Sequence, residues 1–188
     1  MAGDLVVMYL GKVVEAGPTY EIFNSPYHPY TKALISAKPD LDNTFTENAK
    51  GLEGFVPDPA RPPQGCRFHT RCELATPNCG WEIDDVVRWL EDTPGMFEEL
   101  VGVERKSEFS AILVFTNEAA AAKLVKTVRS EKLPFAMRHC LKKLNLDGTK
   151  VQIEFDEVDE VFLKEQGNRR SACLLSPEDV FKGVKYGN

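Results

Sequence analysis

The sequence predicts a mixed α+β fold, in which a short β-hairpin and helices precede a Pro-rich arm with a cysteine loop and then a small α+β domain. Two kinds of apolar periodicity support this class. Residues 83–90 carry apolar side chains at helical spacing, whereas residues 151–155 alternate between apolar and polar, as in a half-exposed strand. With 43% hydrophobic and 28% charged residues, the 188-residue chain has the composition of a globular protein.

Residues 1–37 form the first predicted domain. Strands at residues 5–9 and 12–15 flank a turn at Leu10-Gly11, and a helix is expected at about residues 20–23. Because Ser25-Pro26 interrupts that helix, a second one is expected to start after Pro29, with Pro39 ending it.

Residues 38–80 form the second predicted domain, a Pro-rich arm that ends in a cysteine loop. Five prolines lie between positions 39 and 63, with Asn, Asp and Glu among them. This composition is typical of an extended linker. The arm leads directly into the segment that carries Cys66, Cys72 and Cys79.

Residues 81–167 form the third predicted domain, an α+β unit expected to fold by itself. Residues 108–115 are apolar on both faces and predict a buried central strand. Asn117 can cap the helix that follows, and Asp147-Gly148 predicts a turn before the strand at 151–155. Three helical faces are expected, made by Ile83, Val86, Val87 and Leu90, by Ala121, Leu124, Val125 and Val128, and by Met137, Cys140, Leu141 and Leu144.

Residues 168–188 form the last predicted domain, a C-terminal strand and helix that includes Cys173. One or two strands are expected within residues 158–175, and Ser176 is placed to cap a short final helix.

The charge balance and hydropathy exclude several functions. The net charge is -6 and the sequence pI about 5.2, which argues against nucleic acid as a partner, because phosphate contacts need clustered Lys and Arg. No apolar run approaches the roughly 20 residues that span a bilayer, and residues 1–4 lack the basic and apolar regions of a signal peptide. We therefore expect a cytosolic protein that can dock on a membrane complex.

Three cysteines lie within 14 residues, separated by five and six residues. Cys66, Cys72 and Cys79 are soft thiolate ligands of the kind that Fe–S clusters and zinc prefer. The alternatives are a [4Fe–4S] cluster, a zinc ion, or thiols without a metal. Arg67 and Arg71 could offset the negative charge of a cluster, or could form an exposed basic loop.

Two histidines are further candidates for metal ligands. His69 could ligate a metal from within the loop, although packing is the simpler interpretation. His28 has no acid or nucleophile beside it in sequence, so we expect it to pack and cap the helix near Tyr30.

Two stretches resemble the ATP-binding subunits of oligopeptide/dipeptide ABC importers. Residues 7–17 read VMYLGKVVEAG and residues 25–34 read SPYHPYTKAL, which is similar to the end of the ATPase fold and its HPY segment. Residues 57–79, from PDPARPPQGCRFHTRC to Cys79, resemble the cysteine-bearing tail of the same subunits. Together the stretches cover most of residues 4–80, whereas residues 81–167 match nothing in the family and look like an insertion into its tail.

The resemblance implies a [4Fe–4S] cluster held by Cys66, Cys72, Cys79 and a fourth cysteine, with zinc as the second choice. Residues 167–174 resemble the short strand in which the family places its last cysteine, so Cys173 is the expected fourth ligand. Cys140 is its rival, but it lies on an apolar helix face and is expected to be core.

The sequence also lacks the motifs of an ATPase. No Gly-x-x-x-x-Gly-Lys-Ser/Thr phosphate loop, magnesium-binding acidic strand or ABC signature occurs. We expect those parts upstream of residue 1, in a larger protein or the partner of a split gene, and we expect this chain to have no ATP site and no ATPase activity of its own.

The leading hypothesis is therefore a non-catalytic accessory or regulatory region of an importer ATP-binding subunit. Its expected partners are the ABC ATPase core, the partner ATP-binding subunit and the membrane-spanning permease subunits, on the inner face of the membrane. Two alternatives stay open: a stand-alone Fe–S redox or sensor protein, and a small enzyme that uses residues 81–188. The chain holds only three histidines and no convincing catalytic triad for the latter.

Overall fold

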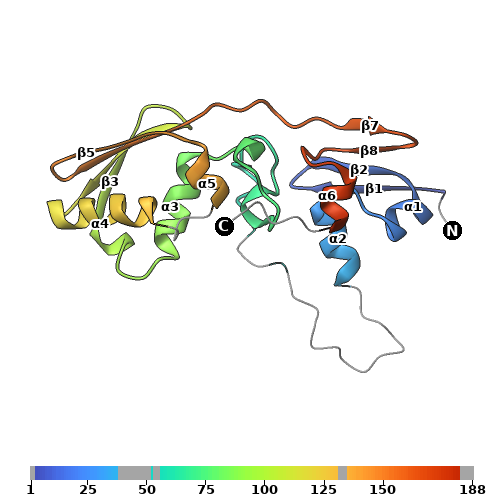
Figure 1. The fold of residues 1–188 in the computed structure, drawn as a ribbon, viewed down its shortest axis with the longest axis horizontal. Helices are drawn as coiled ribbons and strands as arrows, with labels where there is room; N and C mark the ends of the chain where they lie inside the picture. The colour runs from blue at the N-terminus through green and yellow to red at the C-terminus, as the bar shows by residue number, and fades with distance from the viewer. Residues whose placement is uncertain (1–2, 38–51, 53–55, 131–134, 183–188) are drawn as a thin grey trace, which may run out of the picture. The chain divides into compact units, whose positions relative to one another are not determined.

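The computed structural model describes residues 3–37, 52, 56–130 and 135–182. It divides into two compact units, the first made of residues 1–75 and 160–187 and the second of residues 76–159. Within the described residues there are six α-helices and two four-stranded antiparallel sheets (Figure 1), which confirms the α+β class. Most of the predicted Pro-rich arm lies outside the described residues.

The sheet of the first unit has the strand order β1-β2-β8-β7. β1 (Asp4–Tyr9) and β2 (Lys12–Pro18) form the predicted hairpin. Its two-residue turn places Leu10 at φ 45° and Gly11 at φ 80°, the positive values that the right-handed twist of a tight hairpin favours. β7 (Lys164–Gln166) and β8 (Arg169–Ser171) are joined through Gly167.

β2 pairs with β8, although the two strands lie near opposite ends of the sequence. Glu15 pairs with Ser171 and Ala16 with Arg170 in an antiparallel ladder. Gly17 lies so close to β8 that an added Cβ would be 2.6 Å from Cγ of Arg169. A side chain at this position would therefore collide with β8.

Two helices follow β2, as expected. α1 (Thr19–Asn24) buries Ile22, and α2 (Pro29–Ser36) begins at the proline that the sequence places at its first turn. Pro39, the expected end of α2, lies outside the described residues, and the helix already ends at Ser36.

The cysteine segment and the C-terminus complete the first unit. A 3-10 turn at His69–Arg71 follows Cys66. The last helix, α6 (Pro177–Lys182), is capped by Ser176, whose hydroxyl accepts from the Asp179 amide at 3.2 Å as predicted. Lys32 Nζ on α2 donates to the carbonyls of Val180 and Phe181, which ties α6 to α2.

The second unit combines a sheet of order β3-β4-β6-β5 with three helices. Its elements in sequence order are a 3-10 turn at Pro77–Cys79, α3 (Ile83–Glu91), a 3-10 turn at Phe97–Glu99, β3 (Leu100–Arg105), β4 (Ser110–Phe115), α4 (Glu118–Arg129), α5 (Phe135–His139), β5 (Leu141–Asp147) and β6 (Lys150–Phe155). Asn117 caps α4 by accepting from the Ala120 amide at 2.9 Å, as expected.

The core of the second unit lies between α4 and one face of its sheet. On β4 and β6 every second side chain is buried, and α4 buries the face predicted from its spacing. The buried residues are Ala111, Leu113, Phe115, Val151, Ile153 and Phe155 on the strands and Ala121, Leu124, Val125 and Val128 on the helix. β4 is a central strand, as the sequence predicted.

The third predicted helical face is wrong beyond Met137. α5 ends at His139, and Leu141 and Leu144 lie on strand β5, opposite Phe155 and Ile153 of β6. The same leucines fit a helical repeat and also fit a strand. The turn at Gly148 brings β6 beside residues 141–147, and pairing with β6 selects the strand over the helix.

The unit boundaries differ from those expected for the inserted domain, residues 81–167. The second unit starts at Thr76 and ends at Asp159, because β7 pairs with β8 in the sheet of the first unit.

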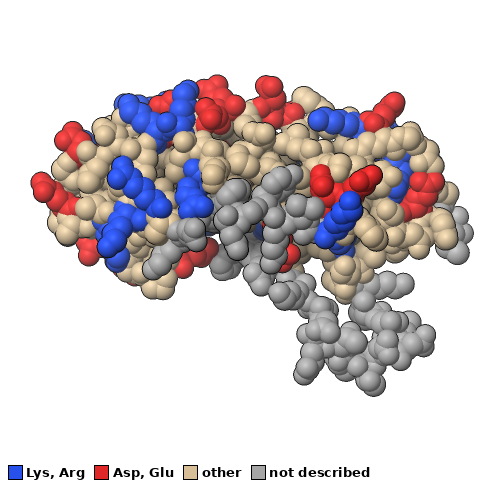
Figure 2. Space-filling model, in the orientation of Figure 1, with Lys and Arg blue, Asp and Glu red and all other residues tan. Residues whose placement is uncertain are grey.

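Acidic and basic side chains are mixed on the surface. On the face drawn in Figure 2, Lys and Arg occur beside Asp and Glu on each unit. None of the helices that the structure describes is both long and apolar enough to cross a membrane.

Candidate functional site

A buried glutamate holds the segment that precedes α2. Glu15 on β2 is fully buried, and its carboxylate accepts hydrogen bonds from the backbone amides of Tyr27 at 2.8 Å and His28 at 3.0 Å. A carboxylate that receives two amides fixes both residues relative to the sheet. The HPY segment therefore starts from a defined position on β2.

His28 caps α2, as the sequence predicted. Its Nδ1 accepts from the Tyr30 amide at 3.1 Å. Burial lowers the pKa of His28 to about 4, although a hydrogen bond with the backbone of Ala172 opposes this shift. The imidazole is thus neutral near pH 7, and its proton is on Nε2 because Nδ1 serves as an acceptor.

Three aromatic rings support the cysteine loop. Phe68 lies 5.3 Å from Tyr9 and 5.2 Å from Tyr30, and the two tyrosine rings are 4.7 Å apart between centroids. Together with Val14, Tyr9 and Phe68 form a buried cluster that joins the hairpin, α2 and the loop. Such packed aromatic groups give a short irregular loop a fixed shape.

Cys66 and Cys72 each pack against this aromatic cluster. Both are half-buried and pack on the Tyr9, Val14 and Phe68 core. Cys66 Sγ is 3.9 Å from Nε2 of His28. His69 is buried, and its Nδ1 is 2.7 Å from the Cys66 carbonyl, so it packs within the loop, as the simpler interpretation expected.

The two arginines of the loop donate hydrogen bonds to backbone carbonyls outside the loop. Arg67 donates to the carbonyl of Leu10, and Arg71 donates to that of Leu52 at 3.1 Å. Both side chains are half-buried. They bind the cysteine loop to the hairpin turn and to Leu52 within the arm.

Cys173 lies in the same unit, just after β8. The Ala172 amide donates to the Val14 carbonyl at 2.8 Å, which extends the pairing with β2 to the residue before Cys173. Cys173 is buried and clusters with Leu175 and Val180, with Leu74 packed against them. Leu74 follows Cys72 by two residues, so the C-terminal segment contacts the end of the cysteine loop.

The remaining two cysteines belong to the second unit. Cys79 is buried, and its sulfur accepts from the Thr76 amide at 3.2 Å. Cys140 is also buried, and its thiol donates to the Met137 carbonyl at 3.0 Å. Its burial confirms the interpretation of Cys140 as a core residue, and it raises the pKa of the thiol to about 12.

None of the five cysteines, all of which the structure describes, is in a disulfide, so each retains a thiol, the type of ligand that soft metals prefer. Across the described ranges, no three His, Cys, Asp or Glu side chains form a group that could hold a metal ion. Cys66, Cys72 and Cys173 are in one unit and Cys79 in the other. The four-cysteine metal centre therefore stays a prediction from spacing and resemblance.

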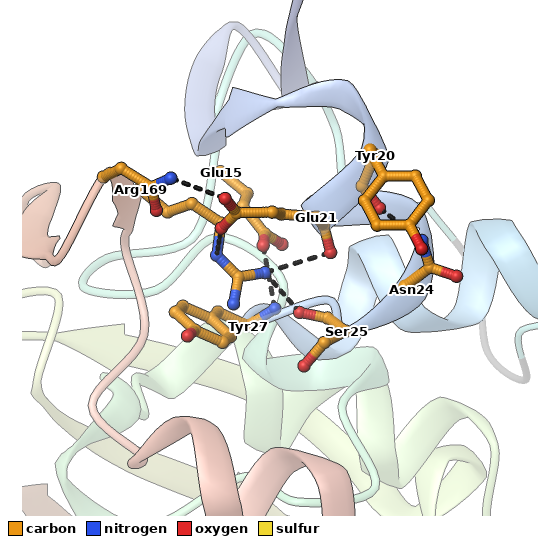
Figure 3. Close-up of polar contacts among 8 residues, drawn as sticks. Glu15, Tyr20, Glu21, Asn24, Ser25, Tyr27 and Arg169 are labelled. Atoms are coloured by element: carbon orange, nitrogen blue, oxygen red, sulfur yellow. Dashed lines mark hydrogen bonds and ion pairs between the residues drawn. The ribbon is translucent and has the colours of Figure 1, made fainter.

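Arg169 on β8 is a residue whose role the sequence did not indicate (Figure 3). It is buried, its guanidinium lies 3.3 Å from the ring centroid of Tyr27, and its Nε is 3.4 Å from a carboxylate oxygen of Glu21. Its Nη1 donates to the carbonyls of Glu21 and Ser25. One side chain from the C-terminal segment thus binds the end of α1 and the start of the HPY segment.

Comparisons with known proteins match the N-terminal part of the chain. Residues 14–79 match the family described as "Oligopeptide/dipeptide transporter, C-terminal region". The chain is 42% identical over 86 residues to the di/tripeptide transport ATP-binding protein DppF of Pseudomonas aeruginosa, a match that covers 46% of this chain and 27% of that protein.

Other relatives match the same part. The oligopeptide transport ATP-binding protein OppF of Salmonella typhimurium is 51% identical over 77 residues, which are 40% of this chain and 23% of OppF. The dipeptide transport ATP-binding protein DppF of Haemophilus influenzae is 47% identical over 79 residues, 42% of this chain and 24% of that protein. The chain thus spans about a quarter of the length of these relatives.

Proposed function

We propose that the chain acts as a non-catalytic accessory or regulatory region of a peptide-transport ATP-binding subunit. Its residues 14–79 match the oligopeptide/dipeptide transporter C-terminal region, and the chain is homologous to the C-terminal part of peptide-transport ATP-binding proteins. The observation that carries the proposal is the match across the HPY segment and the cysteine loop. These are the residues that Glu15, His28 and Phe68 pack into one structure.

The C-terminal segment supports a structural role. β8, α6 and Arg169 all bind elements within or beside the matched residues, although they lie far outside the match in sequence. The family segment and the C-terminal residues therefore form one unit. A second unit with its own core joins the two stretches of the first, which is the organisation expected of an added regulatory part.

The partners that we propose are the ABC ATPase core, the partner ATP-binding subunit and the membrane-spanning permease subunits, at the cytoplasmic face of the membrane. Exposed apolar side chains of the first unit suit such contacts. Val6 and Met8 on β1 are each more than half exposed, as is Tyr20 on α1. Exposed apolar side chains such as these are available for contact with a protein partner.

We also propose that Cys66, Cys72, Cys79 and Cys173 hold a [4Fe–4S] cluster, with zinc as the second choice. The spacing of the first three thiols supports this proposal, as does the fixed loop that carries Cys66 and Cys72. A cluster would supply cross-links between segments that have little core of their own. Anaerobic purification should yield equal amounts of iron and sulfide with broad visible absorption. Stoichiometric zinc in a colourless protein would support zinc instead. The absence of both metals from the purified protein would contradict the proposal.

The accessory role predicts association without catalysis. The purified chain should bind a peptide-transport ATP-binding subunit, or alter the rate at which that subunit hydrolyses ATP. By itself the chain should neither bind nor hydrolyse ATP, because no phosphate loop occurs in the sequence. Pull-down and phosphate-release assays measure this, with an unrelated ABC ATPase as the control. ATP hydrolysis by the chain alone that persists through successive purification steps would contradict the proposal.

A further inference from the structure

A hydrogen bond from the backbone determines which ring nitrogen of His28 is the acceptor. The Tyr30 amide donates to Nδ1 at 3.1 Å, so that nitrogen is an acceptor. A neutral imidazole carries a single proton, which must then be on Nε2. Nε2 is therefore the donor nitrogen of His28.

That donor nitrogen approaches a thiol. Nε2 of His28 lies 3.9 Å from Cys66 Sγ, a separation within the range of hydrogen bonds to the large sulfur atom. His28 is 1% exposed, so the ring is shielded from bulk solvent. The ring is held by the bond of the Glu15 carboxylate to the His28 amide and by Phe68, whose ring centroid is 6.0 Å away.

We propose that His28 is a positioning residue for Cys66, with Nε2–H donating to the cysteine sulfur and holding it in one orientation. The hydrogen bond itself does not depend on a metal. Its consequence rests on the proposed function: a donor to a ligating sulfur orients that ligand and slows loss of the metal. The HPY histidine would then link the helix cap to the cysteine loop.

The backbone of Ala172 competes as the partner of Nε2, since it also forms a hydrogen bond with the ring. The two acceptors can be separated by removing the sulfur. In a Cys66→Ala variant the Nε2–H resonance should move and its exchange with solvent should accelerate. In a Cys72→Ala variant, which loses a neighbouring half-buried thiol, it should stay unchanged.

The direct test is NMR on metal-free protein labelled with ¹⁵N-histidine. Long-range proton–nitrogen correlations identify the tautomer of His28. A protonated Nε2 whose signal shifts in Cys66→Ala but not in Cys72→Ala is the expected result. A protonated Nδ1 would overturn the proposal. A signal that neither variant shifts would also overturn it, and would mean that the Nε2–H group donates to the backbone of Ala172.

The consequence for the metal is tested with two substitutions of His28. Asn keeps an acceptor for the helix cap but is too short to reach the sulfur, whereas Gln can reach it with an amide donor. His28→Asn should lose iron about 10-fold faster than wild type, as expected for removal of a supporting contact, and His28→Gln should recover much of the difference. Equal rates in all three proteins would contradict the inference. Wild-type protein without iron would contradict the metal function instead, and the NMR result would still decide the hydrogen bond.

Discussion

Replacement of Arg169 by Met is expected to lower the free energy of unfolding of the first unit by about 3 kcal/mol. Met keeps an unbranched apolar stem but removes the hydrogen bonds to Glu21 and Ser25 and the stacking on Tyr27. Because the Glu21 side chain is 38% exposed, its carboxylate can regain water. The cost therefore comes mainly from the part-buried Ser25 carbonyl that loses its donor and from the lost cation–π contact, because the Glu21 carbonyl keeps the Ser25 amide as a donor.

The two units can be followed separately in this experiment. The only two tryptophans of the sequence, Trp81 and Trp89, belong to the second unit, so urea unfolding followed by tryptophan fluorescence should be unchanged in that unit. Hydrogen exchange at the Ala172 amide, which bonds to the Val14 carbonyl, reports on the first unit and should accelerate about 100-fold or more.

Two matched variants make the Arg169 result specific. Arg170 is the next residue of the same strand and is exposed, so Arg170→Met should change stability by less than about 0.5 kcal/mol. Arg169→Lys should fall between wild type and Arg169→Met, because an ammonium cannot form the same fork of hydrogen bonds. An Arg169→Met protein as stable as Arg170→Met would show that the buried arginine contributes nothing.

Cys173→Ala is expected to remove most of the bound iron, to below about half of the wild-type content, if the proposed cluster has Cys173 as its fourth ligand. A [4Fe–4S] cluster needs a thiolate for each iron, and loss of one leaves an iron open to solvent and chelators. Iron and sulfide counts after anaerobic purification measure this loss.

Cys140→Ala is the matched control for this prediction. Cys140 is also buried, so its replacement by Ala removes a similar volume from a core, but its thiol already donates to the Met137 carbonyl and should not bind iron. Full iron content in Cys173→Ala together with loss of iron in Cys140→Ala would mean that Cys140, and not Cys173, is the fourth ligand. Full iron content in both variants would leave Cys173 without a role as a ligand.

Local patterns predicted most individual elements. The hairpin before Gly17, the cap at Asn117 and the alternation along β6 each depend on residues within a few positions of one another. In these segments the apolar period, the turn residues and the capping residue all favour the same structure, and consistent local signals are the ones that survive folding.

The segment after Met137 shows where such patterns fail. Leu141 and Leu144 are three residues apart, as on a helix, yet Leu144 and Leu146 are two apart, as on a strand. Only the pairing with β6 selects the strand. The sequence carried a signal for this outcome in the turn residues Asp147-Gly148, which suit a hairpin between adjacent strands.

The contacts of Glu15 and Arg169 could not be predicted from the sequence. A glutamate within a short strand and an arginine in a polar stretch are usually exposed, and nothing near either residue indicates burial. The hydrogen bond from Arg169 to Glu21 joins residues 148 positions apart. Such partners are determined by the tertiary fold, so a single sequence without homologues does not reveal them.

The return of the chain to β2 has a consequence during protein synthesis. β8 can pair with β2 only after residues 76–159 have left the ribosome. Ser171 lies 156 residues after its partner Glu15 (171 − 15), and at about 5–20 residues per second this separation takes roughly 8–30 s. Throughout that interval the edge of β2 that later receives β8 has no strand beside it, and an open strand edge invites pairing with other chains. Slower translation of the second unit should therefore increase aggregation of the nascent protein, whereas slower translation after residue 182 should not.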